Sequence, residues 1–361
     1  MTKPKILILG GTGFIGRNIV NYLVTNDLVD KILVVDKVPP QMAWMNEETK
    51  NVFENSGLVE FRSANLIHQA SVDRALEGET YDFVINCAAE TRPGFAAEIY
   101  EESVYKLGIN CIKGAAKIQG LKRFIQLSSC MSSSGTTEVK EDCIVEPWTM
   151  IGKEHAKLED YLKGQKSVKY TIVRLPVVYG KGDRTGLTPR IIAAILYKHL
   201  NTSMKLLWTK DLKLNTIHVE DVASAIFHLN TNPRAENEIF NVVDQSQSTQ
   251  GSITDILCEI FGIKCEYLGQ VLSKMTQIDV MGVVKEINEE HLELWAKLCK
   301  QNELNTPLTP YIDADVLQNK HINMSNEKLT GFGFKFKFPV LKKELIQDVI
   351  DDYVIQKLLP K

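Results

Sequence analysis

A glycine-rich segment near the N-terminus constrains the fold of this chain more than any other feature. The run Gly10-Gly11-Thr12-Gly13-Phe14-Ile15-Gly16 follows an apolar stretch, Ile6–Leu9, and opens a segment with helical apolar spacing. A strand, a tight glycine turn and a helix in this order bring backbone N–H groups and the positive helix end to a pyrophosphate. The order therefore predicts a dinucleotide site.

Asp36 supports this prediction from the end of the second apolar stretch, Ile32–Val35. It lies twenty residues beyond Gly16, where a carboxylate can accept hydrogen bonds from both ribose hydroxyls. The same charge repels a 2′-phosphate, so we expect NAD as the cofactor and NADP to be less favoured. Lys37, the next residue, softens that repulsion.

The composition excludes several classes of protein. The 361 residues include 42 Lys+Arg and 45 Asp+Glu, a formal net charge of −3, which argues against a nucleic-acid or polybasic membrane module. The seven cysteines form no C-x-x-C pair, so we expect neither a disulfide framework nor a metal site. We also find no secretory signal and no apolar run of about eighteen residues, and we predict a cytoplasmic protein.

The first half of the chain alternates short apolar runs with helix-length segments, which is typical of parallel strands joined by helical crossovers. This predicts an α/β fold with a Rossmann-type doubly wound sheet. The expected Rossmann domain comprises residues 1–180 and about 212–245, and residues 181–211 and 246–361 are expected to form a smaller, mixed substrate or lid region. The predicted strands are Ile6–Leu9, Ile32–Val35, Val59–Arg62, Phe83–Asn86, Phe124–Leu127 and Thr171–Arg174, and the later helices include Leu187–Leu200, Glu220–Leu229, Ser252–Phe261, Met275–Lys300 and Leu341–Leu359.

Over about residues 4–260 the chain resembles the NAD-dependent epimerase/dehydratase branch of the extended short-chain dehydrogenase/reductase superfamily. Besides the glycine run, the resemblance rests on Ala64-Asn65-Leu66, Asn86-Cys87-Ala88-Ala89, Gly108-Ile109-Asn110-Cys111, Ser128-Ser129, the turn from Arg174 to Gly180, His218–Ala223 and Phe240–Val242. It implies cofactor contacts from the glycine run and from Asp36, Lys37, Asn65, Leu66, Cys87, Ala88, Ala89, Asn110, Ser128, His155 and Pro176.

The chain departs from this family at the catalytic motif. Family members carry Tyr-x-x-x-Lys on the helix after the fifth strand, where the phenol exchanges a proton with the substrate and the lysine lowers its pKa. Alignment on Pro147, Gly152 and Glu159 places Ile151 at the tyrosine position and His155 at the lysine position. An isoleucine cannot transfer a proton. The one Tyr-x-x-x-Lys in the chain, residues 353–357, is interpreted as fortuitous.

Three residues are candidates for a replacement catalytic group. His155 titrates near neutral pH and shares a helix face with Ile151, although the same apolar stripe favours a structural role or a contact with the cofactor ribose. Counting back from Gly135 places Cys130 at the family's Ser/Thr position, as a nucleophile or as a small filler. Asn110 matches the family's helix asparagine.

Loops after the fourth and fifth predicted strands, with the turn after Arg174, are expected to meet at the carboxyl edge of the sheet and bind a substrate. Arg92 and Arg184 are predicted to hold a phosphate or carboxylate there, unless each forms a surface salt bridge instead. The full set of candidate substrate residues is Glu90, Thr91, Arg92, Ser132, Tyr179 and Arg184.

These observations leave three hypotheses, and whether the protein is an enzyme stays open. The first is an NAD-binding regulatory or scaffold protein with a degenerate catalytic motif. The alternative is a non-standard NAD-dependent oxidoreductase, epimerase or dehydratase that acts on a nucleotide sugar or similar small molecule through His155 or Cys130. The third is a relic with an empty nucleotide cleft, which the retained glycines and Asp36 disfavour. The expected partners are a small-molecule ligand and, by the resemblance, a second copy or a regulatory protein, with no nucleic acid and no membrane.

Overall fold

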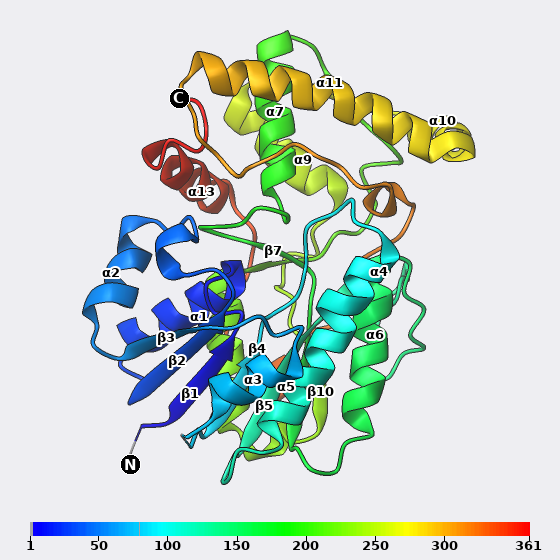
Figure 1. Ribbon diagram of the computed structural model, residues 1–361. Coiled ribbons are helices and arrows are strands. Elements are labelled where there is room, and N and C mark those ends of the chain that lie inside the picture. The colour runs from blue at the N-terminus through cyan, green and yellow to red at the C-terminus, as the bar shows by residue number, and fades with distance from the viewer. Residues whose placement is uncertain (1–2, 79) are drawn as a thin grey trace.

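The computed structural model describes residues 3–78 and 80–361, and a seven-stranded parallel sheet forms its centre (Figure 1). The strands run in the order β10-β6-β5-β4-β1-β2-β3. This architecture confirms the predicted α/β fold with a doubly wound sheet. The strand bounds are β1 (Lys5–Leu9), β2 (Lys31–Asp36), β3 (Val59–Ser63), β4 (Phe83–Asn86), β5 (Arg123–Ser129), β6 (Tyr170–Leu175) and β10 (Glu238–Asn241).

Helices cover both faces of the sheet, because alternate residues of each buried strand point to opposite sides. Ile6 and Ile8 of β1 pack with α1 (Phe14–Thr25), α2 (Glu47–Asn55) and α8 (Val219–Thr231). Leu7 and Leu9 pack on the other face with α3 (Gln69–Leu76), α5 (Leu107–Ala115) and α6 (Met150–Lys163). A short helix, α4 (Ala97–Tyr100), continues through a π-helical segment, Glu101–Lys106, into α5.

A second helical region lies beside the carboxyl edge of the sheet (Figure 1). The helices α7 (Thr188–Leu200), α9 (Gln250–Phe261), α11 (Val280–Gln301) and α13 (Lys343–Ile355) surround an apolar core of their own. The helix α12 (Glu327–Gly331) instead returns to the sheet, where Leu329 is fully buried. Two small parallel pairs, β7 (Val177–Tyr179) with β9 (Thr216–His218) and β8 (Met204–Leu206) with β11 (Cys265–Tyr267), connect the regions.

The helix predicted at Met275–Lys300 is divided in the structure. The helix α10 (Gly269–Thr276) ends before a 3-10 turn at Gln277–Asp279, and α11 begins at Val280. The Asp279 carboxylate accepts a hydrogen bond from the Gly282 backbone at 2.9 Å, so it caps a new helix rather than continuing the old one.

A crevice is expected at the centre of the sheet, where the strand order reverses. From β1 the chain proceeds to β2 on one side and returns to β4 on the other, which makes the β1–β4 junction the topological switch point. Gly10, Asp36 and Cys87 follow β1, β2 and β4 at the same carboxyl edge. The predicted dinucleotide residues thus meet where folds of this kind bind ligands.

Two kinds of feature are absent from the described part of the chain. In residues 3–78 and 80–361, no helix has both the length and the apolar character needed to cross a bilayer. Within the same residues, no three side chains of the His, Cys, Asp and Glu types gather closely enough to hold a metal ion.

Candidate functional site

The glycine turn after β1 is packed so tightly that larger residues do not fit. Gly10 has a positive φ of 75°, and a Cβ at this position would lie 2.7 Å from the Cα of Ala88. A Cβ on Gly16 would lie 2.4 Å from the Gly10 carbonyl oxygen. Phe14 and Ile15 form the first turn of α1, whose N-cap is Gly13. The turn thus brings the backbone to the N-terminus of α1, the kind of position at which a pyrophosphate can be bound.

Asp36 stands at the end of β2 with its carboxylate directed at the same turn. One oxygen accepts the Thr12 N–H at 3.2 Å, and the other accepts the Val38 N–H at 3.1 Å. The Thr12 hydroxyl in turn donates to the Val38 carbonyl at 3.0 Å. A carboxylate oxygen can accept more than one hydrogen bond, so Asp36 keeps capacity for ribose hydroxyls. Lys37 is exposed beside it.

The segments after β3 and β4 are each held by side-chain hydrogen bonds. Ala88, against which Gly10 packs, is positioned by its N–H donating to the Asn86 side chain at 3.1 Å. Asn110 donates its amide hydrogens to the carbonyls of Ile67 and Leu66, at 2.7 and 3.3 Å. Asn110 therefore positions the segment that carries Asn65 and Leu66, a role that its candidacy as a catalytic residue did not anticipate.

The helix α6, which carries the family's catalytic positions, is fixed by a buried ionic network. Glu159 accepts a hydrogen bond from Ser128 at 2.6 Å and two from Arg174, at 3.0 and 2.7 Å. The side chains of Glu159 and Arg174 are each 1% exposed. The N-terminal end of α6 packs equally closely, because a Cβ on Gly152 would lie 2.8 Å from the Met131 carbonyl oxygen. The sequence analysis used Glu159 and Arg174 only as alignment landmarks and missed their pairing.

Cys130 and His155 are both buried in their neutral forms. Burial raises the pKa of the Cys130 thiol well above its ordinary value, so the thiolate that a nucleophilic role requires is disfavoured. Burial also lowers the pKa of His155 to about 4, only partly offset by Glu159. The imidazole Nδ1 has no hydrogen-bond partner among the described residues. The tight Gly10 turn fits a bound dinucleotide, whereas the Nδ1 atom of His155 is enclosed by the protein.

The residue at the family's tyrosine position and two buried tyrosines lie in three different environments. Ile151 is half-buried in the first turn of α6. Tyr353, from the fortuitous motif, lies in α13 and donates its hydroxyl to the Asp183 carbonyl. Tyr179 is buried against the His218 ring, with ring centroids 5.2 Å apart, and its hydroxyl has no partner among the described residues. Burial raises the Tyr179 pKa, so the phenol stays protonated.

The candidate substrate residues do not form one cluster. Arg92 pairs with Glu90 at 2.7 Å and is largely exposed, as is Thr91, so for Arg92 the salt-bridge alternative holds. Within the described residues Arg184 has no such pair, and it lies instead beside Arg17 of α1 at a cavity that the sequence analysis did not predict. The side chain of Ser132 is outside the described part of the structure.

The segment that contains Asp313 and Asp315, from the second helical region, contacts two elements at the edge of the site. The backbone N–H of Gly94, in the loop after β4, donates to Asp313 at 2.8 Å, and the N–H of Met150, at the start of α6, donates to Asp315 at 2.9 Å. Asp313 and Asp315 therefore tie the loop of Arg92 to the helix of Ile151. No local pattern could reveal this contact, because its partners are more than 150 residues apart in sequence.

The sheet order, the glycine turn at the switch point and the acid after β2 define a dinucleotide-binding protein of the Rossmann type. A family model described as the NAD dependent epimerase/dehydratase family matches residues 6–242. The chain belongs to this family, within the extended short-chain dehydrogenase/reductase superfamily.

Individual relatives agree with this assignment. A Methanocaldococcus jannaschii protein assigned as a UDP-glucose 4-epimerase is 24% identical over 278 residues, which are 72% of this chain and 84% of the relative. A UDP-N-acetylglucosamine 4-epimerase from Methanobrevibacter ruminantium has a similar fold, with a TM-score of 0.70, 18% identity and coverage of 99% of this chain and 100% of that one. The Thermus thermophilus UDP-glucose 4-epimerase in complex with NAD also has a similar fold, with a TM-score of 0.68 and 19% identity. The match covers 97% of this chain and 99% of that one.

These comparisons correct the first functional hypothesis. Nothing in them supports a regulatory or scaffold protein, whereas the family and the curated relative are described by epimerase and dehydratase activities. The alternative, an NAD-dependent enzyme, fits them better.

Proposed function

We propose that the protein binds NAD and acts on a nucleotide sugar or a similar small molecule as an oxidoreductase, epimerase or dehydratase. The position of the glycine turn at the switch point carries this proposal, because it brings the N-terminus of α1 to the place where folds of this kind bind a pyrophosphate. The family and its relatives support the reaction class. Asp36 supports NAD over NADP, since its charge opposes a 2′-phosphate and its oxygens can accept from two ribose hydroxyls.

The assignment of roles follows from protonation. Bound NAD would supply the acceptor and donor of hydride. His155 would stay a neutral imidazole beside the nicotinamide ribose, because burial lowers its pKa too far for a shuttle near neutral pH. Cys130 would fill the space beside it as a thiol. Ile151 has no proton to exchange, so the proton would pass between the substrate and solvent or a group on the substrate itself.

A direct assay tests the proposal. The purified protein with NAD is incubated with UDP-glucose, UDP-N-acetylglucosamine, UDP-glucuronic acid and dTDP-glucose, and the sugars are separated by chromatography while NADH absorbance is followed. We expect NAD binding and conversion of at least one nucleotide sugar. Gly10→Ala should abolish both, and Asp36→Ala should weaken NAD binding. NAD binding without conversion of any sugar, at catalyst concentrations equal to substrate, would contradict an enzymatic function. Absence of NAD binding would contradict the whole proposal.

A further inference from the structure

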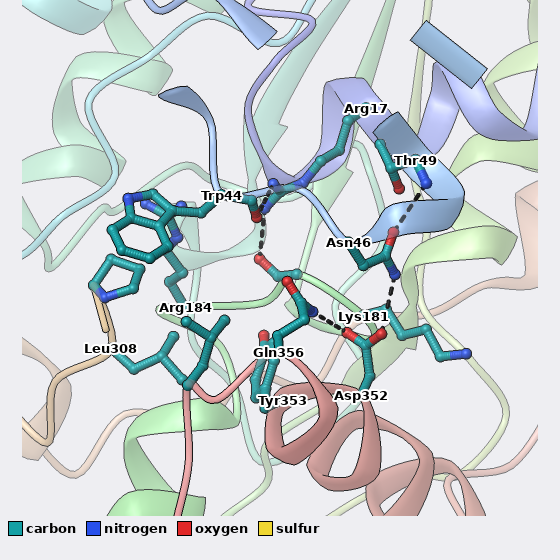
Figure 2. Close-up of a pocket in the computed structure, with 13 residues that line it drawn as sticks. Arg17, Trp44, Asn46, Thr49, Lys181, Arg184, Leu308, Asp352, Tyr353 and Gln356 are labelled. Carbon is teal, nitrogen blue, oxygen red and sulfur yellow. Dashed lines mark hydrogen bonds between the residues drawn. The ribbon is translucent and has the colours of Figure 1, made fainter. Parts of the chain in front are cut away.

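A small cavity lies outside the dinucleotide crevice, between α1 and the second helical region (Figure 2). Its volume is about 20 Å³, room for one water-sized group, and it opens toward solvent. Figure 2 shows Arg17 entering from α1, Asn46 from the residue before α2, Arg184 from the turn before α7, and Asp352 and Tyr353 from α13. The cavity is called the Arg17–Arg184 pocket below.

Arg17 brings a buried positive charge to this pocket without a carboxylate to balance it. Its side chain is on a residue that is 4% exposed, and three of its five N–H donors bond the carbonyls of Ala43, Trp44 and Gly182, at 2.9, 2.9 and 3.1 Å. It has no ion pair among residues 3–78 and 80–361. Burial and the nearby Arg184 charge lower the pKa of Arg17 to about 10.

Arg184 forms fewer hydrogen bonds to the described residues than Arg17 does. Its single hydrogen bond to the described residues is a long one, 3.4 Å to the Ala43 carbonyl, and it has no carboxylate partner among them. Its backbone is held firmly, because the neighbouring Asp183 accepts the N–H groups of Gly186 and Leu187, at 2.7 and 2.8 Å, and the Asp183 carbonyl accepts the Tyr353 hydroxyl. The turn therefore keeps the guanidinium at the pocket.

The other charged groups at the pocket form no ion pair with either arginine among the described residues, although the charge of Asp352 favours the charged form of Arg17. Lys181 also lines the pocket and pairs with Asp348 at 3.3 Å. The one lining carboxylate, Asp352, accepts hydrogen bonds from Asn46 at 3.0 Å and Gln356 at 2.7 Å, and burial raises its pKa. Two cations held together away from water are unfavourable unless an anion joins them.

We propose that the Arg17–Arg184 pocket binds a phosphate group, either inorganic phosphate or the terminal phosphate of a small metabolite. The paired N–H donors of a guanidinium group match the spacing of phosphate oxygens. A phosphate has enough oxygens to accept from both arginines, whereas a carboxylate has only two. A phosphate would place one oxygen in the enclosed volume of about 20 Å³ and its remaining oxygens at the open side of the pocket. The bound phosphate would link α1 to the turn before α7. This site goes beyond the proposed cofactor crevice and does not depend on catalysis.

Calorimetric titration with inorganic phosphate at constant ionic strength tests the pocket. The variants are Arg184→Gln, which removes the charge, Arg184→Lys, which keeps the charge but loses the fork, and the control Arg74→Gln at an exposed arginine of α3. We expect wild type and Arg74→Gln to bind equally, Arg184→Gln at least tenfold more weakly, and Arg184→Lys between them. If Arg184→Gln does not fold, the comparison of Arg184→Lys with wild type decides.

Saturation with NAD separates this site from the cofactor crevice. We expect phosphate affinity to be unchanged by NAD, and NAD affinity to be unchanged in both Arg184 variants. No phosphate binding by wild type, equal binding by Arg184→Gln, or loss of phosphate binding on NAD saturation would overturn the proposal. Titration with glucose 1-phosphate identifies the source, because tighter binding than inorganic phosphate indicates a phosphate ester and weaker binding indicates the free ion. Failure to bind NAD would contradict the proposed function and leave this test intact.

Discussion

Glu159 and Arg174 form an ion pair with two hydrogen bonds in the interior between α6 and β6, where both side chains are 1% exposed. Glu159→Ala would leave the Arg174 charge buried without a partner, and we expect the free energy of unfolding to fall by about 3–5 kcal/mol. Urea denaturation measures this loss. The control is Glu259→Ala, which removes an exposed pair with Lys343 and should cost about 1 kcal/mol or less. Equal losses in the two variants would refute the structural role of the buried pair.

Alanine variants of Gly10 and Gly57 distinguish the effect of backbone strain from the effect of a steric clash. Both have a positive φ, of 75° and 67°, but a Cβ would meet the Ala88 backbone at 2.7 Å in the first case and nothing within 4 Å in the second. We expect Gly10→Ala to abolish NAD binding and Gly57→Ala to reduce stability by about 1 kcal/mol with NAD affinity retained. Fluorescence titration with NADH and thermal unfolding measure the two effects. Retained affinity in Gly10→Ala would contradict the placement of the cofactor.

Asp36 should govern both the affinity and the choice of cofactor. We expect Asp36→Ala to weaken NAD binding by about 1–2 kcal/mol through the loss of ribose hydrogen bonds, and to weaken NADP binding less, because a repulsive charge is removed as well. Asp30→Ala, at the opposite end of β2, is the control and should change neither affinity. The ratio of NAD to NADP dissociation constants is the decisive quantity, and an unchanged ratio would argue against ribose recognition by Asp36.

The buried imidazole of His155 should make the protein less stable in acid. Burial lowers its pKa to about 4, whereas histidine in an unfolded chain titrates near 6.5. Between these values the unfolded chain binds more protons, so the free energy of unfolding falls as pH falls, by about 1.4 kcal/mol per pH unit, and the contribution is constant above pH 6.5.

The difference in stability between wild type and His155→Gln isolates this effect. Burial raises the pKa of Asp244 to about 6, which acts in the opposite direction over the same range, but Asp244 is present in both proteins and its contribution cancels. Urea denaturation at pH 7, 6 and 5 should show the free energy of unfolding of wild type falling relative to that of His155→Gln as the pH is lowered. A difference independent of pH would indicate that His155 is solvated or already charged.

Ile151 and His155 allow a gain-of-function test. Ile151→Tyr with His155→Lys restores the family pair, and general acid–base catalysis typically contributes at least about 100-fold, so we expect turnover of the substrate found in the assay to rise by about that factor. Ile151→Phe with His155→Lys adds the same ring without the hydroxyl and should not exceed wild type. Equal turnover in the two double variants, measured as kcat, would show that proton transfer at this position does not limit the reaction.

The sequence predicted what local patterns encode. The apolar runs located β1 to β6, and the glycine run with Asp36 located the switch-point crevice, because strand periodicity and the βα turn are written in consecutive residues. The contacts of Arg17 with Gly182 and of Met150 with Asp315 join residues more than 150 positions apart, and no local signal announces them. Likewise, Arg92 gave the same sequence signal as Arg184, but only the structure shows that Glu90 neutralises the first and that the second has no such neighbour.

The network of Ser128, Glu159 and Arg174 holds α6 from its middle, two turns away from Ile151 and one from His155. The frame that orients the helix and the side chains that would perform the reaction are thus separate parts of one element. Substitutions at residues 151 and 155 can therefore remove or restore reactivity while α6 keeps its position on the sheet. This start of α6 can be redesigned without changing the contacts that hold the helix.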